Sequence, residues 1–178
     1  LILAKAKISS CNRRFDIVLG DAEHLPFTDE VFDAIVCIST MHYFADSDPG
    51  LTEFLRVLKE KGVFVFGDLT LHEMDNRRFL DTLEKTLSRA HAKYFKPSEM
   101  KRLLESCGFH VSRMKVTPYR KSYLSLMEDK GRYFDVKPEA LDKCIQGATA
   151  HERKLYSMSD TELTLFYTLI TALKESKS

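Results

Sequence analysis

The chain has 178 residues, of which 44% are hydrophobic and 30% are charged, an ordinary globular composition. Its formal net charge is +1, so no electrostatic argument favours nucleic acid or an anionic membrane as a partner. No apolar run reaches the roughly 18–20 residues that a membrane helix needs. The four cysteines lie far apart without a C-x-x-C pair, which favours reduced thiols in a cytoplasmic protein over a zinc site or a disulfide scaffold.

Three short apolar runs predict strands at Phe15–Gly20, Phe32–Ile38 and Val63–Gly67. None of them alternates cleanly between apolar and polar residues, which is typical of strands buried on both faces, as in a parallel sheet covered by helices. Two further strand-like pieces, about Phe109–Val116 and Lys121–Met127, are joined by only four residues. That connection is too short for a parallel crossover, so we expect an antiparallel hairpin at the sheet edge.

Helices are expected between and after these strands. Asp48 and Pro49 can begin one, since Asp is a good cap and Pro suits the first helical position. Apolar spacing indicates a second helix near Phe79–Ala90, and Pro97 opens a third that Gly108 stops. This alternation predicts an α/β fold: a Rossmann-like, doubly wound, mostly parallel sheet with an antiparallel edge hairpin.

The last part of the chain is expected to be a C-terminal helical appendage, residues 131–178, attached to a domain of residues 1–130. Pro138 starts one helix in this appendage. The sequence Ser159–Glu162 is a capping-box pattern before an apolar stripe at residues 163–173, which predicts a second helix there. We expect these helices to pack on the domain or on a partner.

Polar residues follow each of the three expected strands, at the place where doubly wound sheets bind their ligands. The segments are Gly20–Ala22 after the first strand, Ile38–His42 after the second and Gly67–Glu73 after the third. Asp21 and His42 are therefore expected to face one crevice.

A family resemblance lies in the run GDAEHLPFTDEVFDAIV, residues 20–36. This run closely resembles the signature GDA-x-x-LPF-x-D-x-x-FD-x-V of class I S-adenosylmethionine-dependent methyltransferases, in particular the small-molecule group typified by ubiquinone/menaquinone C-methyltransferases. Met41–Phe44 is similar to the L-H-H-F segment of that group. Arg56–Phe66 is similar to its R-V-L-K-P-G-G segment, with Glu60-Lys61 where Pro-Gly is usual, and Lys96–Phe109 resembles its late helix-to-strand passage.

The resemblance covers about residues 1–127. The family's glycine-rich loop and the acidic residue that holds the ribose would lie upstream of Leu1, together with the first two strands of the sheet. Leu1–Ile8 looks like the helix that follows that acidic residue. We therefore expect roughly 50–70 further residues before Leu1 in the natural protein, by analogy with common domain lengths.

The resemblance implies S-adenosylmethionine as the cofactor and methyl transfer to a small-molecule acceptor. Asp21 would accept a hydrogen bond from the adenine amino group, and the Ala22 N–H would donate to a ring nitrogen. Ile38 and Ser39 would line the path of the adenosine and the methionine. His42 would lie near the transferred methyl group and is the candidate for a general base.

Simpler interpretations stay open for each of these residues. Asp21 could be only a turn residue and His42 only a packed histidine. Asp68 with His72-Glu73 could hold a metal, although a solvent-facing helix start is simpler and no metal is expected. Tyr94-Phe95 could wall a pocket or belong to the core. The alternative to an enzyme is a non-catalytic methyltransferase-like scaffold or partner subunit; a homo-oligomer is left open, and neither nucleic acid nor a membrane is an expected partner.

Overall fold

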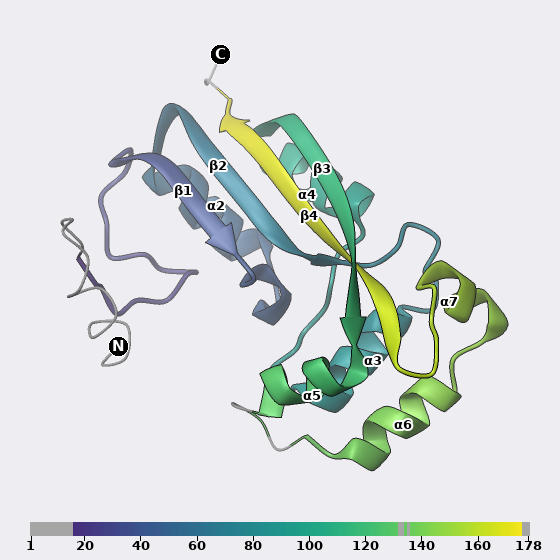
Figure 1. The fold of residues 1–178 in the computed structure, drawn as a ribbon. Helices are drawn as coiled ribbons and strands as arrows, with labels where there is room; N and C mark the ends of the chain where they lie inside the picture. Colours follow the sequence, from purple (N-terminus) through teal and green to yellow (C-terminus); the bar gives the residue numbers. More distant parts are fainter. Residues whose placement is uncertain (1–15, 132–133, 135, 176–178) are drawn as a thin grey trace, which may run out of the picture.

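A computed structural model of the chain describes residues 16–131, 134 and 136–175. Its strands form one open sheet in the order β1-β2-β4-β3 (Figure 1). β1 pairs in parallel with β2, whereas β4 pairs antiparallel with both β2 and β3. β1, β2 and β3 therefore run in one direction and β4 runs against them. The bounds are β1 Phe32–Ile38, β2 Leu58–Thr70, β3 Phe109–Ser122 and β4 Glu162–Lys174.

The helices fall into two groups. α2 and α4 lie against one face of the sheet, and α3, α5 and α6 lie together beyond the end of β3 (Figure 1). Within the described part of the chain, no helix is long and apolar enough to cross a membrane. The bounds are η1 Met41–Tyr43, α2 Asp48–Val57, α3 Phe79–Leu87, α4 Pro97–Ser106, α5 Tyr123–Gly131, α6 Pro138–Gln146 and α7 Ala150–Leu155.

Each group of helices has its own buried core. The first core joins the sheet to α2 and α4 and includes Phe64, Phe66 and Ile170. The second core joins α3, α5 and α6 to the C-terminal end of β2 and the N-terminal end of β4, and it includes Leu83 and Tyr156. Burial of such side chains contributes about 1.5–3 kcal/mol each, so both helix groups are held by apolar packing.

The local helix signals of the sequence are confirmed. α2 begins at Asp48 with Pro49 in its first turn, and α4 begins at Pro97. Gly108 follows α4 with a φ of 101°, a left-handed conformation that glycine adopts without strain. These signals succeed because they depend only on neighbouring residues.

The predicted hairpin of residues 109–116 and 121–127 is wrong. Residues 109–122 form the single strand β3, and α5 follows at Tyr123. β3 can contain Pro118 because it is an edge strand, where a missing N–H need not break a ladder. Its antiparallel partner is β4, so the expected antiparallel pair at the sheet edge does exist but is built from other segments.

The predicted helix at residues 163–173 is also wrong, since this segment is the strand β4. It pairs with β2 on one side and with β3 on the other. Thr168, Ile170 and Ala172 are buried in alternation, as expected of a strand. Ser159 Oγ accepts a hydrogen bond from Glu162 N at 3.2 Å, but this contact closes a turn before a strand. The expected C-terminal appendage is therefore not helical throughout, because only α6 and α7 match that description.

Of the first expected strand, Phe15 lies outside the described residues and residues 16–20 form no strand. Leu19 is 81% exposed there. A strand needs a hydrogen-bonded neighbour, and none of the described residues forms a ladder with this segment. β1 is not buried on both faces either: Val36 is 64% exposed, and of the described helices α2 and α4 cover the sheet from one side (Figure 1).

Candidate functional site

A clamp on α2 fixes the turn that carries the signature sequence. Arg56 Nη1 donates to the Phe27 carbonyl and to Asp29 Oδ1, both at 2.8 Å, and Nη2 donates to the Leu25 carbonyl at 3.1 Å. Glu53 accepts hydrogen bonds from Leu25 N at 2.8 Å and from Arg56 Nε at 2.7 Å. The Arg56 guanidinium holds the pKa of Glu53 at about 2. The Leu-Pro-Phe and Arg-Val-Leu motifs are thus two parts of one structural unit.

The start of this turn presents a carboxylate to solvent. Asp21 Oδ1 accepts a hydrogen bond from Glu23 N at 3.0 Å, so Asp21 is indeed a turn residue. Its side chain is nevertheless 67% exposed, and its oxygens can still accept from a ligand. Ala22 beside it packs against the first core. The turn role and a binding role of Asp21 are therefore compatible.

The second part of the candidate site lies where the chain leaves β1 beside the C-terminal part of β2. Ser39 N donates to the Gly67 carbonyl at 2.7 Å, and Ser39 adopts a left-handed φ of 50° that turns the chain toward η1. A Cβ at Gly67 would lie 2.5 Å from Ile38 Cδ1 and 2.7 Å from Tyr167 Oη, so any larger residue there would require the ends of these two side chains to move. We name Ser39, His42, Gly67, Asp68 and Tyr167 the strand-end cluster.

A buried histidine–carboxylate pair forms the centre of this cluster. His42 Nδ1 lies 2.8 Å from Asp68 Oδ1 and 2.9 Å from Oδ2. His42 is 6% exposed and Asp68 is 3% exposed. Because the carboxylate is an acceptor, it favours the tautomer of a neutral His42 that carries its proton on Nδ1, and in that tautomer Nε2 has the lone pair. Nε2 is buried and has no hydrogen-bond partner among the described residues.

Tyr167 and Tyr43 flank the pair. Burial, together with the negative charge of Asp68, raises the pKa of the Tyr167 hydroxyl, so this tyrosine stays protonated. The ring of Tyr43 stacks at a tilt on His42 with centroids 4.0 Å apart, and Tyr43 is 41% exposed. Tyr43 is therefore a partly exposed ring in contact with the buried histidine.

A second buried pair packs beside the first. His91 Nε2 lies 2.8 Å from Asp81 Oδ1, which also accepts from Tyr94 N at 2.5 Å, and Arg78 Nε donates to Asp81 Oδ2 at 2.6 Å. Burial acts to raise the pKa of Asp81, but these donors outweigh it and hold that pKa below its usual value. The His91 and Tyr94 rings lie 5.7 Å and 5.3 Å from the His42 ring, so Asp81 fixes one wall around His42.

The structure brings some of the predicted residues together and leaves others apart. Ile38, Ser39 and His42 lie together at the end of β1, whereas no hydrogen bond or ion pair joins Asp21 to them within the described part of the chain. The shared crevice of Asp21 and His42 therefore stays a prediction. Sequence reasoning missed Tyr167, because its segment was predicted to be a helix.

The residues considered as metal ligands have separate partners. Asp68 binds His42, and Glu73 accepts hydrogen bonds from Ser98 N and Oγ at 2.8 and 2.7 Å. The ring of His72 packs edge-on against Phe166. No group of three or more metal-binding side chains occurs among the residues that the structure describes. Tyr94-Phe95, in contrast, is buried as core.

Solved structures of known proteins share this arrangement. A proposed methyltransferase of Bacillus halodurans superimposes with a TM-score of 0.89 over 98% of this chain and 78% of its own, at 23% identity. The YcgJ protein of Bacillus subtilis gives a TM-score of 0.82 over 99% of this chain and 78% of its own, at 22% identity. This chain has the methyltransferase fold. Sequence comparison agrees with it, since residues 1–66 match the family described as a methyltransferase domain.

Curated relatives match this chain over shorter stretches. A fatty-acid O-methyltransferase of Mycolicibacterium smegmatis is 41% identical over 66 residues, 34% of this chain and 24% of the relative. A malonyl-[acyl-carrier protein] O-methyltransferase of Geobacter sulfurreducens is 33% identical over 98 residues, 52% of this chain and 37% of the relative. A phthiotriol/phenolphthiotriol dimycocerosates methyltransferase of Mycobacterium ulcerans is 39% identical over 74 residues, 39% of this chain. That match spans 27% of the relative's length, so these proteins share only part of their sequence with this chain.

Proposed function

We propose that the protein containing this chain is an S-adenosylmethionine-dependent methyltransferase that acts on a small molecule. The observation that carries this proposal is the signature turn: Arg56 clamps it to α2 and leaves the Asp21 carboxylate exposed. The match of residues 1–66 to a methyltransferase domain supports the same function.

The residues at the strand ends fit such a cofactor. Asp21 offers acceptor oxygens for an adenine amino group, and the small side chain of Ala22 leaves room for a purine beside its N–H. We assign Ile38 and Ser39 to the wall of the path that the adenosine and methionine parts of the cofactor occupy. We place His42 at the end of this path, beside the methyl group that is transferred. When bound, S-adenosylmethionine supplies an electrophilic methyl group on a sulfonium centre.

We assign acid–base work to His42. The lone pair on Nε2 would take the proton of a carbon-acid or hydroxyl acceptor as that acceptor displaces the sulfonium sulfur, which would leave as a neutral thioether, and Asp68 would stabilise the resulting imidazolium. Because Nε2 is buried, a neighbouring side chain has to move before an acceptor can reach it, and we assign this movement to Tyr43, which contacts His42 and is 41% exposed. Asp68 is thus a positioning residue for the histidine.

The names of two relatives support an oxygen acceptor, since they are O-methyltransferases of a fatty acid and of malonyl-[acyl-carrier protein]. The resemblance of residues 20–36 to ubiquinone/menaquinone C-methyltransferases supports a carbon acceptor instead. A general base at His42 serves a carbon acceptor, because a carbon acid must lose a proton. A carboxylate oxygen is already ionised at neutral pH and needs no base, so loss of His42 should affect the two classes of acceptor differently.

A methyl-transfer assay tests the proposal. The protein in its full natural length is incubated with methyl-labelled S-adenosylmethionine and with fatty acids or quinols as acceptors. Transfer of label to one class identifies the acceptor atom. Cofactor binding without transfer to any acceptor of either class would contradict the assigned acceptors, and absence of cofactor binding would favour a non-catalytic scaffold.

A further inference from the structure

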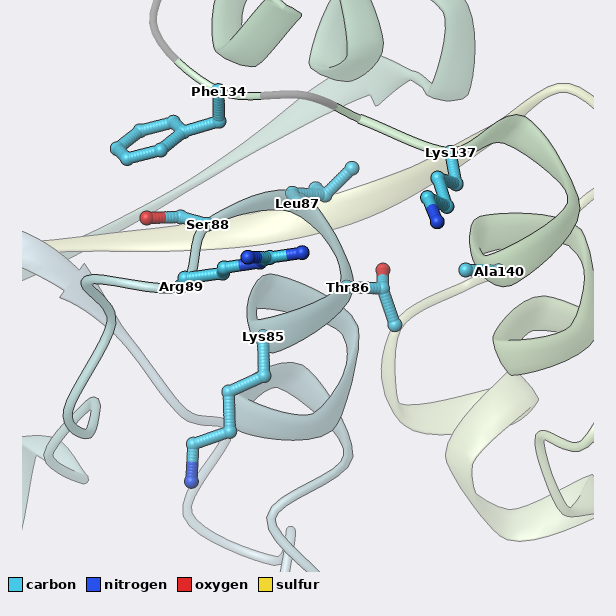
Figure 2. A pocket seen from close by; sticks show the side chains of 8 residues that line it. All are labelled: Lys85, Thr86, Leu87, Ser88, Arg89, Phe134, Lys137 and Ala140. Atoms are coloured by element: carbon cyan, nitrogen blue, oxygen red, sulfur yellow. The ribbon is translucent and has the colours of Figure 1, made fainter.

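A pocket lies between the end of α3 and the start of α6, and its volume is about 450 Å³ (Figure 2). This volume falls within the range of about 300–1,000 Å³ that small-molecule sites occupy. None of its lining residues belongs to the strand-end cluster. They are Lys85, Thr86, Leu87, Ser88, Arg89, Phe134, Lys137 and Ala140.

Among the described residues that line this pocket, the charged side chains are all cationic. Figure 2 shows Arg89 and Lys137 extending toward one space from opposite sides with Thr86 between them, whereas the ammonium group of Lys85 points away. No described residue forms an ion pair with Arg89 or Lys137, and the lining residues that the structure describes include no acidic side chain. Two like charges that face one space without a counter-ion favour an anionic ligand.

The position of Lys137 is not explained by a favourable interaction with a helix dipole. Lys85 and Arg89 lie at the C-terminal end of α3, where positive charge complements the helix dipole. Lys137, in contrast, is the N-cap of α6, where positive charge is unfavourable, and no side chain caps that helix end. Glu139 in the first turn of α6 is exposed and does not line the pocket. The positive end of α6 thus adds to the charge of Lys137.

The remaining lining residues favour an organic ligand over a bare ion. Phe134, Leu87 and Ala140 give the pocket apolar walls. Thr86 Oγ1 already donates to the Leu83 carbonyl at 2.7 Å, so recognition of an anion falls to the cations. Ser88 lies between Phe134 and Arg89 in Figure 2, and its buried hydroxyl has no hydrogen-bond partner among the described residues.

We propose that this pocket binds an organic phosphate monoester, with its phosphate between Arg89 and Lys137 at the start of α6 and its apolar part against Phe134 and Leu87. A dianionic phosphate matches two cations and a helix N-terminus better than a monoanionic carboxylate does. This site is independent of the methyl-transfer function proposed above, because it uses none of the same residues.

Calorimetric titration of phenyl phosphate into the full-length protein at low ionic strength tests this site. We expect submillimolar binding that weakens about tenfold in Arg89→Gln and in Lys137→Gln, since each loses one charged contact. Lys154→Gln is the matched control, because Lys154 is an exposed lysine on α7 outside the pocket. Its affinity should equal that of the wild type, and unfolding midpoints should confirm that all variants fold.

Titrations with inorganic phosphate and with benzoate test the two halves of the proposed ligand separately. Inorganic phosphate and benzoate should each bind more weakly than phenyl phosphate, because each lacks one half of the recognised ligand. If inorganic phosphate binds as tightly as phenyl phosphate, the proposed contact with an organic group is wrong. If benzoate binds more tightly than phenyl phosphate, the proposed preference for a phosphate group is wrong. Undetectable phenyl phosphate binding, or an affinity that both pocket variants leave unchanged, would overturn the site itself.

Discussion

Removing the carboxylate of Asp81 should destabilise the protein strongly. Asp81→Ala leaves three donors without their acceptor: the ring of His91, the backbone N–H of Tyr94 and the guanidinium of Arg78. His91 and Asp81 are both buried. Breaking a buried pair from one side costs about 3–5 kcal/mol. For a domain of this size, about 2–4 °C is lost per kcal/mol, so the melting temperature should fall by about 10 °C.

Urea unfolding of the full-length protein measures this loss, with Asp142→Ala on the exposed face of α6 as the control. The pKa of Asp81 is held below its usual value, so its stabilisation is present above the pKa of the unfolded state and is lost as the pH falls through the folded value. The difference between wild type and variant should therefore be constant from neutral pH down to about pH 5 and shrink below about pH 4. A loss no larger than that of the control would refute the reasoning.

Further substitutions test other parts of the account. Lys61→Gly should stabilise the protein by about 1 kcal/mol in urea unfolding, because Lys61 has a left-handed φ of 59°, whereas Glu60→Gly should not. Gly67→Ala should destabilise it by about 0.5–1.5 kcal/mol, because the ends of the Ile38 and Tyr167 side chains must move, while Gly131→Ala, where a Cβ meets nothing within 4 Å, should not. Asp68→Asn should lower kcat by about a hundredfold with cofactor affinity unchanged; equal losses of both would contradict its positioning role.

Local signals in the sequence were sufficient for much of the fold. The starts of α2 and α4 follow from Pro49 and Pro97, and the strand β1 from its apolar run, because these features depend on adjacent residues. The α/β class follows from the alternation of strands with helices and from the family resemblance. The order of the last two strands does not, because the sequence pattern predicts a strand at residues 121–127 and a helix at residues 163–173.

The strand β4 shows where such reasoning fails. Leu163, Phe166, Ile170 and Leu173 fit a helical spacing, while Thr164, Thr168 and Thr171 between them favour a strand. The choice is made by partners about 100 residues away along the chain, since Phe66 pairs with Ile170. Spacing alone contains no information on such a partner.

Some residues of the candidate site could be identified from the sequence, and others could not. His42 could be singled out because it follows a predicted strand, and Asp68 because it follows the next one. Asp81 and His91 belong to no motif, and they meet only because the chain folds back after α3. The clamp of Arg56 on the signature turn likewise joins two recognised motifs whose contact the sequence did not reveal.

Binding of S-adenosylhomocysteine to the full-length protein tests the central claim most directly. Isothermal titration should show tight binding by the wild type, a loss of affinity in Asp21→Ala and full affinity in Asp16→Ala, an exposed aspartate just before the signature turn. Equal binding by the wild type and Asp21→Ala would contradict the assigned adenine contact. No binding by the folded wild type would contradict the methyltransferase function itself.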